Sequence, residues 1–166
     1  MSNLYKKTFG GRFGFSLIEL LVVMTIIAIL IGAGTVSYTK DQQRGRDGQR
    51  KSDLKRVQAV LEVYIQQNGK YPSSSSGSIQ CNVGLPDPLT WGTSNFTCNS
   101  ITYLKNLPKD PKYQSTTGYY YRSYGSPNPT SYDISAELEN DNDPDRITGP
   151  TPCTPYGGRD YCVKNP

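Results

Sequence analysis

The chain has 166 residues, with 18 Lys and Arg against 14 Asp and Glu, no His and four Cys. This length allows one ordinary domain with an appendage but hardly two full domains. The net charge of +4 is too small to argue for nucleic-acid binding by itself. The absence of His excludes Ser/His/Asp and Cys/His catalytic sites and every zinc site that contains His.

One long apolar run lies near the N-terminus. From Phe15 to Val36 the sequence reads FSLIELLVVMTIIAILIGAGTV, and its single ionisable side chain is Glu19. A helix of about 20 such residues crosses the hydrocarbon layer of a bilayer, and this run is long enough to do so. A secretory signal peptide is the rival interpretation, because basic residues precede the run, but its apolar region is usually ~7–15 residues long. We therefore expect a membrane helix, and a cut near Gly32-Ala33-Gly34 stays open.

Glu19 is the unusual residue of this run. An Asp, Lys or Arg at the centre of a membrane helix costs ~2.5–3.5 kcal/mol, and intramembrane ionisable groups usually mark a function or a partner. The alternative is that Glu19 lies near the membrane interface and reaches water.

The residues Gly14-Phe15-Ser16-Leu17-Ile18-Glu19 and the bases before them (Lys6, Lys7, Arg12) resemble the processing site of type IV prepilins, a family that includes the type II secretion pseudopilins. The resemblance implies that a prepilin peptidase removes the leader by cutting after Gly14 on the cytoplasmic side. It also implies that the same enzyme methylates Phe15, the new N-terminal residue. Glu19 then matches the glutamate at the fifth position of the mature family chain.

Cleavage would place a positive charge close to Glu19. The new α-amino group of Phe15 has a reference pKa of ~7.7–8.0 and is protonated near neutral pH. In a filament this ammonium can pair with Glu19 of a neighbouring subunit, so that two charges that are costly apart in lipid become tolerable together. Glu19 would then set the stagger between helices.

Basic residues also follow the apolar run, so the positive-inside rule leaves its orientation ambiguous. Between positions 40 and 56 they are Lys40, Arg44, Arg46, Arg50, Lys51, Lys55 and Arg56. They could form a solvated helix face, contact anionic headgroups or line an inter-subunit surface, and the first is the default. The cysteines and the topology of the resembled family favour an N-terminus inside and a C-terminus outside.

An amphipathic helix is expected over residues 39–70. Leu54, Val57, Leu61, Tyr64 and Ile65 form an apolar stripe at helical period. Asn68-Gly69 supplies a helix stop, and Pro72 follows it.

The remaining sequence predicts loops and short strands. Pro72–Gly77 is Ser-rich and reads as a flexible, exposed loop, and 79–104 as irregular segments or short strands held by cysteines. Tyr119–Tyr124 and the alternating segment Tyr132–Leu138 predict an antiparallel hairpin packed on the amphipathic helix. The tyrosines at 119–121 favour sheet packing over a stacking platform for bases or sugars.

This part of the chain is similar to the major pseudopilin branch of the family. The similarity rests on Asp53-Leu54, on Asn68-Gly69-Lys70-Tyr71-Pro72, on Leu107-Pro108-Lys109-Asp110-Pro111 and on Tyr132-Asp133-Ile134. It covers most of 14–140, and the C-terminal segment 147–166 has no counterpart.

The four cysteines all follow the predicted helices. Four cysteines allow three pairings, and proximity favours Cys81–Cys98 and Cys153–Cys162. Disulfides suit an extracytoplasmic compartment, whereas a zinc site would need closer, paired spacing.

Six acids and no base lie between Asp133 and Asp145. All-oxygen ligands suit Ca²⁺, but the EF-hand pattern fails because Arg146 stands where Gly is required. The resemblance to major pseudopilins implies a calcium site here, with Asp141, Asp143 and Asp145 as ligands. The alternative is a solvated acidic loop.

We therefore expect an α+β pilin-like fold with four segments: leader 1–14, transmembrane and filament-core helix 15–38, amphipathic helix 39–70, and the rest of the globular domain, 71–166. The expected function is structural: a subunit of a type II secretion pseudopilus or a type IV pilus-like filament, and not an enzyme. The alternatives are a type IV pilin for adhesion or DNA uptake and a membrane-tethered binding module. The partners that the resemblance implies are copies of the chain itself, a prepilin peptidase, an assembly ATPase and a platform membrane protein. The expected location of the chain is the inner membrane before assembly and a cell-envelope filament afterwards. Nothing in the sequence favours nucleic acid as a partner. Calcium is the one cofactor considered.

Overall fold

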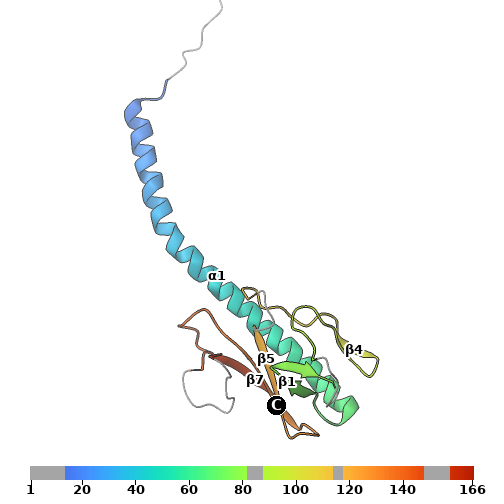
Figure 1. The fold of residues 1–166 in the computed structure, drawn as a ribbon. Coiled ribbons are helices and arrows are strands. Elements are labelled where there is room, and N and C mark those ends of the chain that lie inside the picture. Colours follow the sequence, from blue (N-terminus) through green and yellow to red (C-terminus); the bar gives the residue numbers. More distant parts are fainter. Residues whose placement is uncertain (1–13, 82–87, 114–117, 148–157) are drawn as a thin grey trace, which may run out of the picture. The chain divides into compact units, whose positions relative to one another are not determined.

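A computed structural model of the chain describes residues 14–81, 88–113, 118–147 and 158–166 (Figure 1). It forms two compact units, Met1–Thr39 and Lys40–Pro166. The long helix α1 runs from Leu17 to Asn68 and contributes to both units. The described strands are β1 (Ser73–Ser75), β2 (Ser78–Gln80), β3 (Phe96–Cys98), β4 (Ile101–Leu104), β5 (Tyr119–Tyr124), β6 (Ser131–Ala136) and β7 (Tyr161–Lys164). The predicted α+β class, with a long N-terminal helix and small antiparallel sheets, is confirmed.

In the second unit, α1 packs through the predicted apolar stripe. Leu54, Val57, Leu61 and Tyr64 are each at most 2% exposed and belong to the same core as the strands. The helix ends as predicted: the N–H of Gly69 donates to the carbonyl of Ile65 at 2.8 Å, and Gly69 has a φ of +71°. This left-handed conformation favours glycine, which explains why the helix stops here.

The main sheet has three antiparallel strands in the order β5-β6-β7. The predicted hairpin is present, with Tyr119 opposite Ala136 and Tyr124 opposite Ser131. The second face of β6, the central strand, is also covered: Asp133 and Ser135 are 4% and 1% exposed, and Asp133 accepts hydrogen bonds from the side chains of Arg122 and Tyr124 in β5. Strand β7 lies within the C-terminal segment 147–166, for which the sequence offered no placement.

The expectation of an exposed loop at Pro72–Gly77 is wrong. Pro72 is buried, and the segment contributes β1 and the turn to β2, with Ser76 and Gly77 at φ +50° and +83°. Two adjacent positive φ values are the mark of a tight type I′ hairpin turn, which a Ser-rich run with glycine can form. The carbonyl of Gly77 accepts the N–H of Tyr121 at 2.8 Å, which attaches this hairpin to β5.

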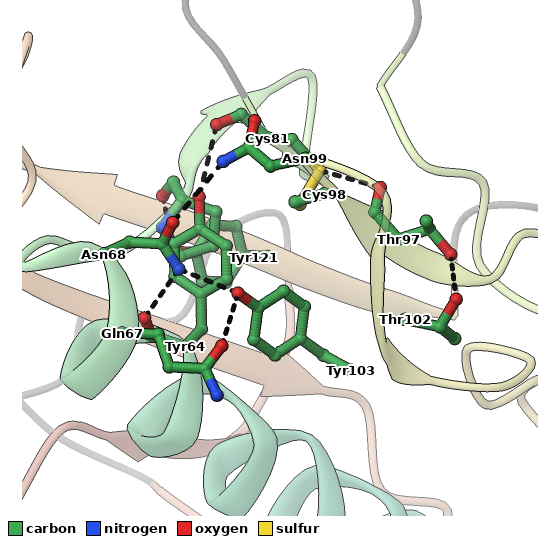
Figure 2. Close-up of a disulfide and its surroundings, with 11 residues drawn as sticks. Tyr64, Gln67, Asn68, Cys81, Thr97, Cys98, Asn99, Thr102, Tyr103 and Tyr121 are labelled. Carbon is green, nitrogen blue, oxygen red and sulfur yellow. Dashed lines mark hydrogen bonds between the residues drawn. A yellow bond between two sulfur atoms is a disulfide. The ribbon is translucent and has the colours of Figure 1, made fainter.

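A disulfide joins the two small hairpins, as Figure 2 shows. It links Cys81, just after β2, to Cys98 at the end of β3, the pairing that proximity favours, with Cα atoms 5.5 Å apart. Tyr103 of β4 accepts a hydrogen bond from the side chain of Asn68 at 2.9 Å, so the β3-β4 hairpin also contacts the end of α1. Cys162 is disulfide-bonded as well. Its expected partner, Cys153, lies outside the described residues.

Candidate functional site

The predicted processing site lies at the start of α1. Gly14, Phe15 and Ser16 precede the helix, and the side chain of Phe15 is 79% exposed. The carbonyl of Ser16 accepts the N–H of Leu20 at 3.2 Å, which makes Ser16 the N-cap. The rest of the predicted leader, residues 1–13, lies outside the described residues.

Glu19 lies in the first turn of α1, and its side chain is exposed. The unpaired N–H groups at a helix N-terminus carry a partial positive charge, which favours a carboxylate at this position. Glu19 is therefore compatible with the helix and remains accessible to a partner.

The first turns of α1 expose an unusually apolar surface. The large apolar side chains from Phe15 to Ile31 are 44–82% exposed: Phe15, Leu17, Ile18, Leu20, Leu21, Val22, Val23, Met24, Ile26, Ile27, Ile29, Leu30 and Ile31. Contiguous apolar surface of this kind marks a protein or membrane contact. When only the described residues are counted, no helix has the length and hydropathy of a membrane span.

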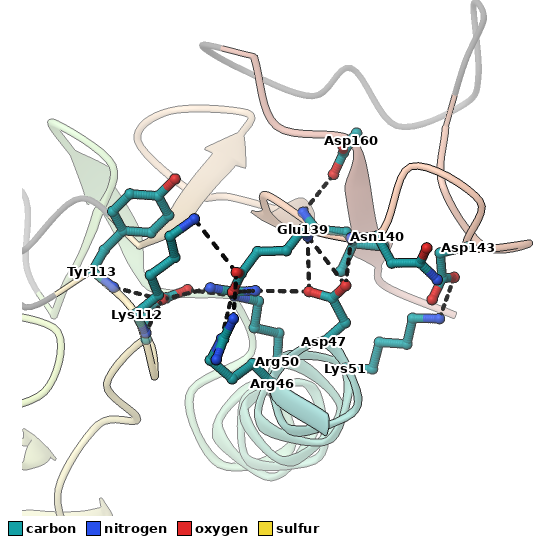
Figure 3. Close-up of polar contacts among 12 residues, drawn as sticks. Arg46, Asp47, Arg50, Lys51, Lys112, Tyr113, Glu139, Asn140, Asp143 and Asp160 are labelled. Atoms are coloured by element: carbon teal, nitrogen blue, oxygen red, sulfur yellow. Dashed lines mark hydrogen bonds and ion pairs between the residues drawn. The ribbon is translucent and has the colours of Figure 1, made fainter. Parts of the chain in front are cut away.

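In the second unit, a network of ion pairs connects α1 to two loops (Figure 3). We call it the Arg50 network, and it consists of Arg46, Asp47, Arg50, Asp110, Lys112 and Glu139. Three bases balance three acids, so the network carries no net formal charge. It shows that the default interpretation of residues 40–56 as a solvated basic face is wrong for Arg50, which is fully buried.

The guanidinium of Arg50 contacts three carboxylates. Its Nε and Nη2 donate to Asp110 at 2.7 and 2.9 Å, and its Nη1 donates to Asp47 at 2.7 Å and to Glu139 at 2.8 Å. Burial disfavours the charged guanidinium, but the hydrogen bonds to these carboxylates outweigh it and raise the pKa of Arg50. The planar guanidinium thus satisfies three acids that come from α1 and from two distant segments.

The carboxylates of the network also hold the loop backbones. Asp110 accepts the N–H groups of Lys112 and Tyr113 at 2.8 and 2.9 Å. Asp47 accepts the N–H groups of Glu139 at 2.9 Å and of Asn140 at 2.8 Å. The network therefore fixes the backbone of both loops as well as their side chains.

Arg46 completes the site of Glu139 with a bidentate contact, at 2.8 Å from Nε and 2.7 Å from Nη2. These hydrogen bonds lower the pKa of Glu139 from 4.5 to about 2, against the effect of burial, and the hydrogen bond from Arg50 contributes in the same direction.

The tyrosines at 119–121 do not form an exposed platform. Tyr119 and Tyr121 are 1% and 0% exposed, and their hydroxyls donate to Asp53 at 2.8 Å and to the carbonyl of Pro72 at 2.7 Å. The prediction of sheet packing is confirmed for these two tyrosines, and Tyr120 is partly buried.

The acids proposed as calcium ligands do not share one site. Asp141 pairs with Arg146, whereas Asp143 and Asp145 both contact Lys51. Within the described ranges, no group of three or more His, Cys, Asp or Glu side chains is arranged to hold a metal ion. Each of these acids thus faces a basic side chain, and calcium binding stays a prediction.

The Arg50 network was not predicted from the sequence. Asp110 and Glu139 lie 60 and 89 positions from Arg50, and neither spacing carries a signal. The nearest signal is the pair Asp47 and Arg50, three positions apart on a helix, which usually marks a surface ion pair.

We expect Arg50→Gln to lower the free energy of unfolding by about 3–5 kcal/mol, because it leaves buried carboxylates without their counter-ion. The control is Arg56→Gln, which removes the same charge from an exposed position of the same helix and should change stability by less than about 0.5 kcal/mol. The measurement is denaturant unfolding of the full chain in detergent, followed by near-UV circular dichroism. Equal losses in the two variants would contradict the role of the network.

The low pKa of Glu139 predicts acid sensitivity. Because the pKa is lower in the folded than in the unfolded chain, the stabilisation is complete above about pH 4.5 and is lost as the pH falls toward 2. The shift corresponds to up to about 3 kcal/mol. Glu139→Gln should flatten the stability profile in this pH window, whereas Glu137→Gln, at an exposed position two residues earlier, should retain it. Parallel profiles for all three chains would refute this assignment.

Comparison with known proteins supports the motif at the start of α1. Residues 11–35 match the family described as the prokaryotic N-terminal methylation motif. This range contains Gly14, Phe15 and Glu19.

Most of the chain is similar to one group of secretion proteins. It is 31% identical over 139 residues to the type II secretion system core protein G of Pseudomonas aeruginosa, with 80% of this chain and 91% of that protein covered. The proteins of the same name from Escherichia coli and Aeromonas hydrophila are 29% and 25% identical, over 59% of this chain and 65% and 66% of theirs. No solved structure matches the chain.

These relatives and the methylation motif identify a structural subunit of a pseudopilus rather than an enzyme. The family expected from the residues around Gly14 and Glu19 is confirmed. The chain belongs to the family of the type II secretion system core protein G, the major pseudopilins.

Proposed function

We propose that this chain matures by cleavage after Gly14 and methylation of Phe15, and then polymerises through its apolar helix into a type II secretion pseudopilus. The observation that carries the secretion assignment is the 31% identity with a type II secretion core protein over 80% of the chain. No comparable observation favours a type IV pilin for adhesion or DNA uptake.

The processing step is supported by the local geometry. The bond between Gly14 and Phe15 lies outside secondary structure, two residues before α1. A peptidase requires an extended, accessible backbone, and an exposed Phe15 meets that need. The methylation motif covers both residues.

Before assembly, the segment 15–38 lies in the inner membrane, with the globular domain outside the cytoplasm. This part of the proposal rests on the sequence and the family: the run Phe15–Val36 is long enough to cross a bilayer and has a single ionisable side chain. The disulfide between Cys81 and Cys98 supports an oxidising compartment for the domain.

In the filament, the exposed apolar residues of 15–31 pack against the same segment of other copies. Glu19 of one copy pairs there with the ammonium of Phe15 in its neighbour. The pair forms only at one stagger of the two helices, so it selects the filament register and avoids two isolated charges in an apolar medium.

The partners that follow from this proposal are a prepilin peptidase for maturation and a platform membrane protein with an assembly ATPase for polymerisation. A membrane-tethered binding module has less support, because Tyr119 and Tyr121, two of the tyrosines that could have stacked on a base or sugar, are buried.

The processing proposal predicts the mass of the mature chain. Intact-mass spectrometry of the protein from cells with an active prepilin peptidase should show loss of Met1–Gly14 and a gain of one methyl group, located on Phe15. A Gly14→Val variant should keep the precursor mass, because the peptidase no longer recognises the cut site. An uncut N-terminus in the unmodified chain would refute the proposed maturation.

The assembly proposal predicts the effect of neutralising Glu19. Glu19→Gln should be cleaved normally but leave the Phe15 ammonium without its partner, which costs about 3 kcal/mol per contact and lowers the association constant about 100-fold. The fraction of protein in sedimentable filaments measures this loss. The matched control is Asp41→Asn, which removes an acid whose side chain is 70% exposed on the same helix and should polymerise normally. Normal polymerisation of Glu19→Gln would exclude the register role.

A further inference from the structure

Lys51 lies between two carboxylates of the segment that follows β6. Its Nζ is 2.5 Å from Asp143 Oδ1 and 2.7 Å from Asp145 Oδ2, and Figure 3 shows it extending from α1 toward Asp143. Lys51 and Asp143 are largely buried, with side chains 19% and 12% exposed, whereas Asp145 is 60% exposed. Burial disfavours the charge of Lys51, but the hydrogen bonds to both carboxylates outweigh it and raise its pKa.

The same ammonium contacts a third element. It lies 5.6 Å from the ring centroid of Tyr161, the first residue of β7. A cation over the face of an aromatic ring is attracted by the negative charge of that face. One cation therefore joins α1, the acidic segment and the edge strand of the main sheet.

The acidic segment is also organised from within. The N–H of Asp145 donates to Asp143 Oδ1 at 3.0 Å, the same oxygen that Lys51 contacts. Arg146 pairs with Asp141 and, at 2.6 Å from its Nε, with Asp160. Two cations thus pair with the acids of the segment after Glu139: Lys51 of α1 and Arg146 of the segment itself.

A divalent cation would find few unpaired carboxylate ligands among Asp141, Asp143 and Asp145. Ca²⁺ takes 6–8 oxygen ligands, and here Asp143 and Asp145 already face an ammonium while Asp141 faces a guanidinium. A calcium ion would have to displace Lys51, or bind beside it against the repulsion of like charges.

We propose that the ammonium of Lys51 is the built-in counter-ion of Asp143 and Asp145, so that the segment 139–147 closes against α1 and β7 without a divalent cation. The proposal departs from the calcium site that resemblance to the major pseudopilins implies. Because Lys51, Asp143 and Asp145 all lie in the second unit, the tests below measure its stability and do not depend on filament assembly.

The first test compares the full chain in detergent with EDTA and with CaCl₂, by thermal unfolding followed through near-UV circular dichroism. The two midpoints should agree within about 1 °C, because calcium is not expected to bind the folded state and therefore cannot stabilise it. A midpoint several degrees higher in CaCl₂ would show that calcium closes the segment, and the proposal would be wrong.

The second test removes the ammonium. Lys51→Gln should lower the midpoint by about 3–6 °C in EDTA, whereas Lys51→Arg, which keeps the charge, should lose less than half of that. The matched control is Lys55→Gln, an exposed lysine one turn further along α1, which should shift the midpoint by less than about 1 °C. Equal midpoints for Lys51→Gln and Lys55→Gln would overturn the proposal.

A double-mutant cycle isolates the contact itself. If Lys51 acts through Asp143, then Asp143→Asn and Lys51→Gln together should lower the midpoint by clearly less than the sum of the two single losses. Additive losses would overturn the proposal. Should Lys51→Gln yield no folded protein, the same cycle with Lys51→Arg and the calcium comparison on the unmodified chain decide the question.

Discussion

The second unit depends on a charge that has no contact with water. A buried guanidinium at Arg50 is tolerable only if every carboxylate around it is held in place, and Asp110 and Glu139 are held by their own bonds to the loop and to Arg46. The apolar stripe that begins at Leu54 is one turn further along the same helix. The network and the stripe therefore both fix the rotation of α1 about its own axis in the second unit. The network does so because Arg50 must point toward its carboxylates, and the stripe because its apolar side chains must stay buried.

The two parts of α1 meet opposite requirements. Residues 15–31 expose apolar side chains that gain free energy only against another apolar surface, so this part is completed by other molecules. Residues 46–51 carry four charged side chains, and each of them is already paired within the second unit. A filament subunit needs both: a helix that can change its surroundings and a domain whose structure does not change with them.

Local patterns explain what could be predicted. Helical periodicity located Leu54, Val57 and Leu61 in the core, the alternation around Ile134 located the main hairpin, and the motif at Gly14 identified the family. Contacts between distant segments could not be predicted in this way. In the sequence, nothing distinguishes Arg50 from a surface arginine, because Asp110 and Glu139 are distant along the chain. Likewise, a Ser-rich run is typical of a loop, and only its turn geometry and its contact with β5 make it a hairpin. The secretion assignment came from similarity to whole proteins, because no side chain encodes the cargo.

The disulfide has a mechanical consequence. Cys81 and Cys98 are 17 positions apart, and a fully extended chain of that length spans about 60 Å. While the bond is intact, this length cannot be drawn out when the subunit is pulled, because the tension between the two cysteines passes through their sulfur atoms. In a filament under load, such a covalent bypass would limit how far each subunit can lengthen.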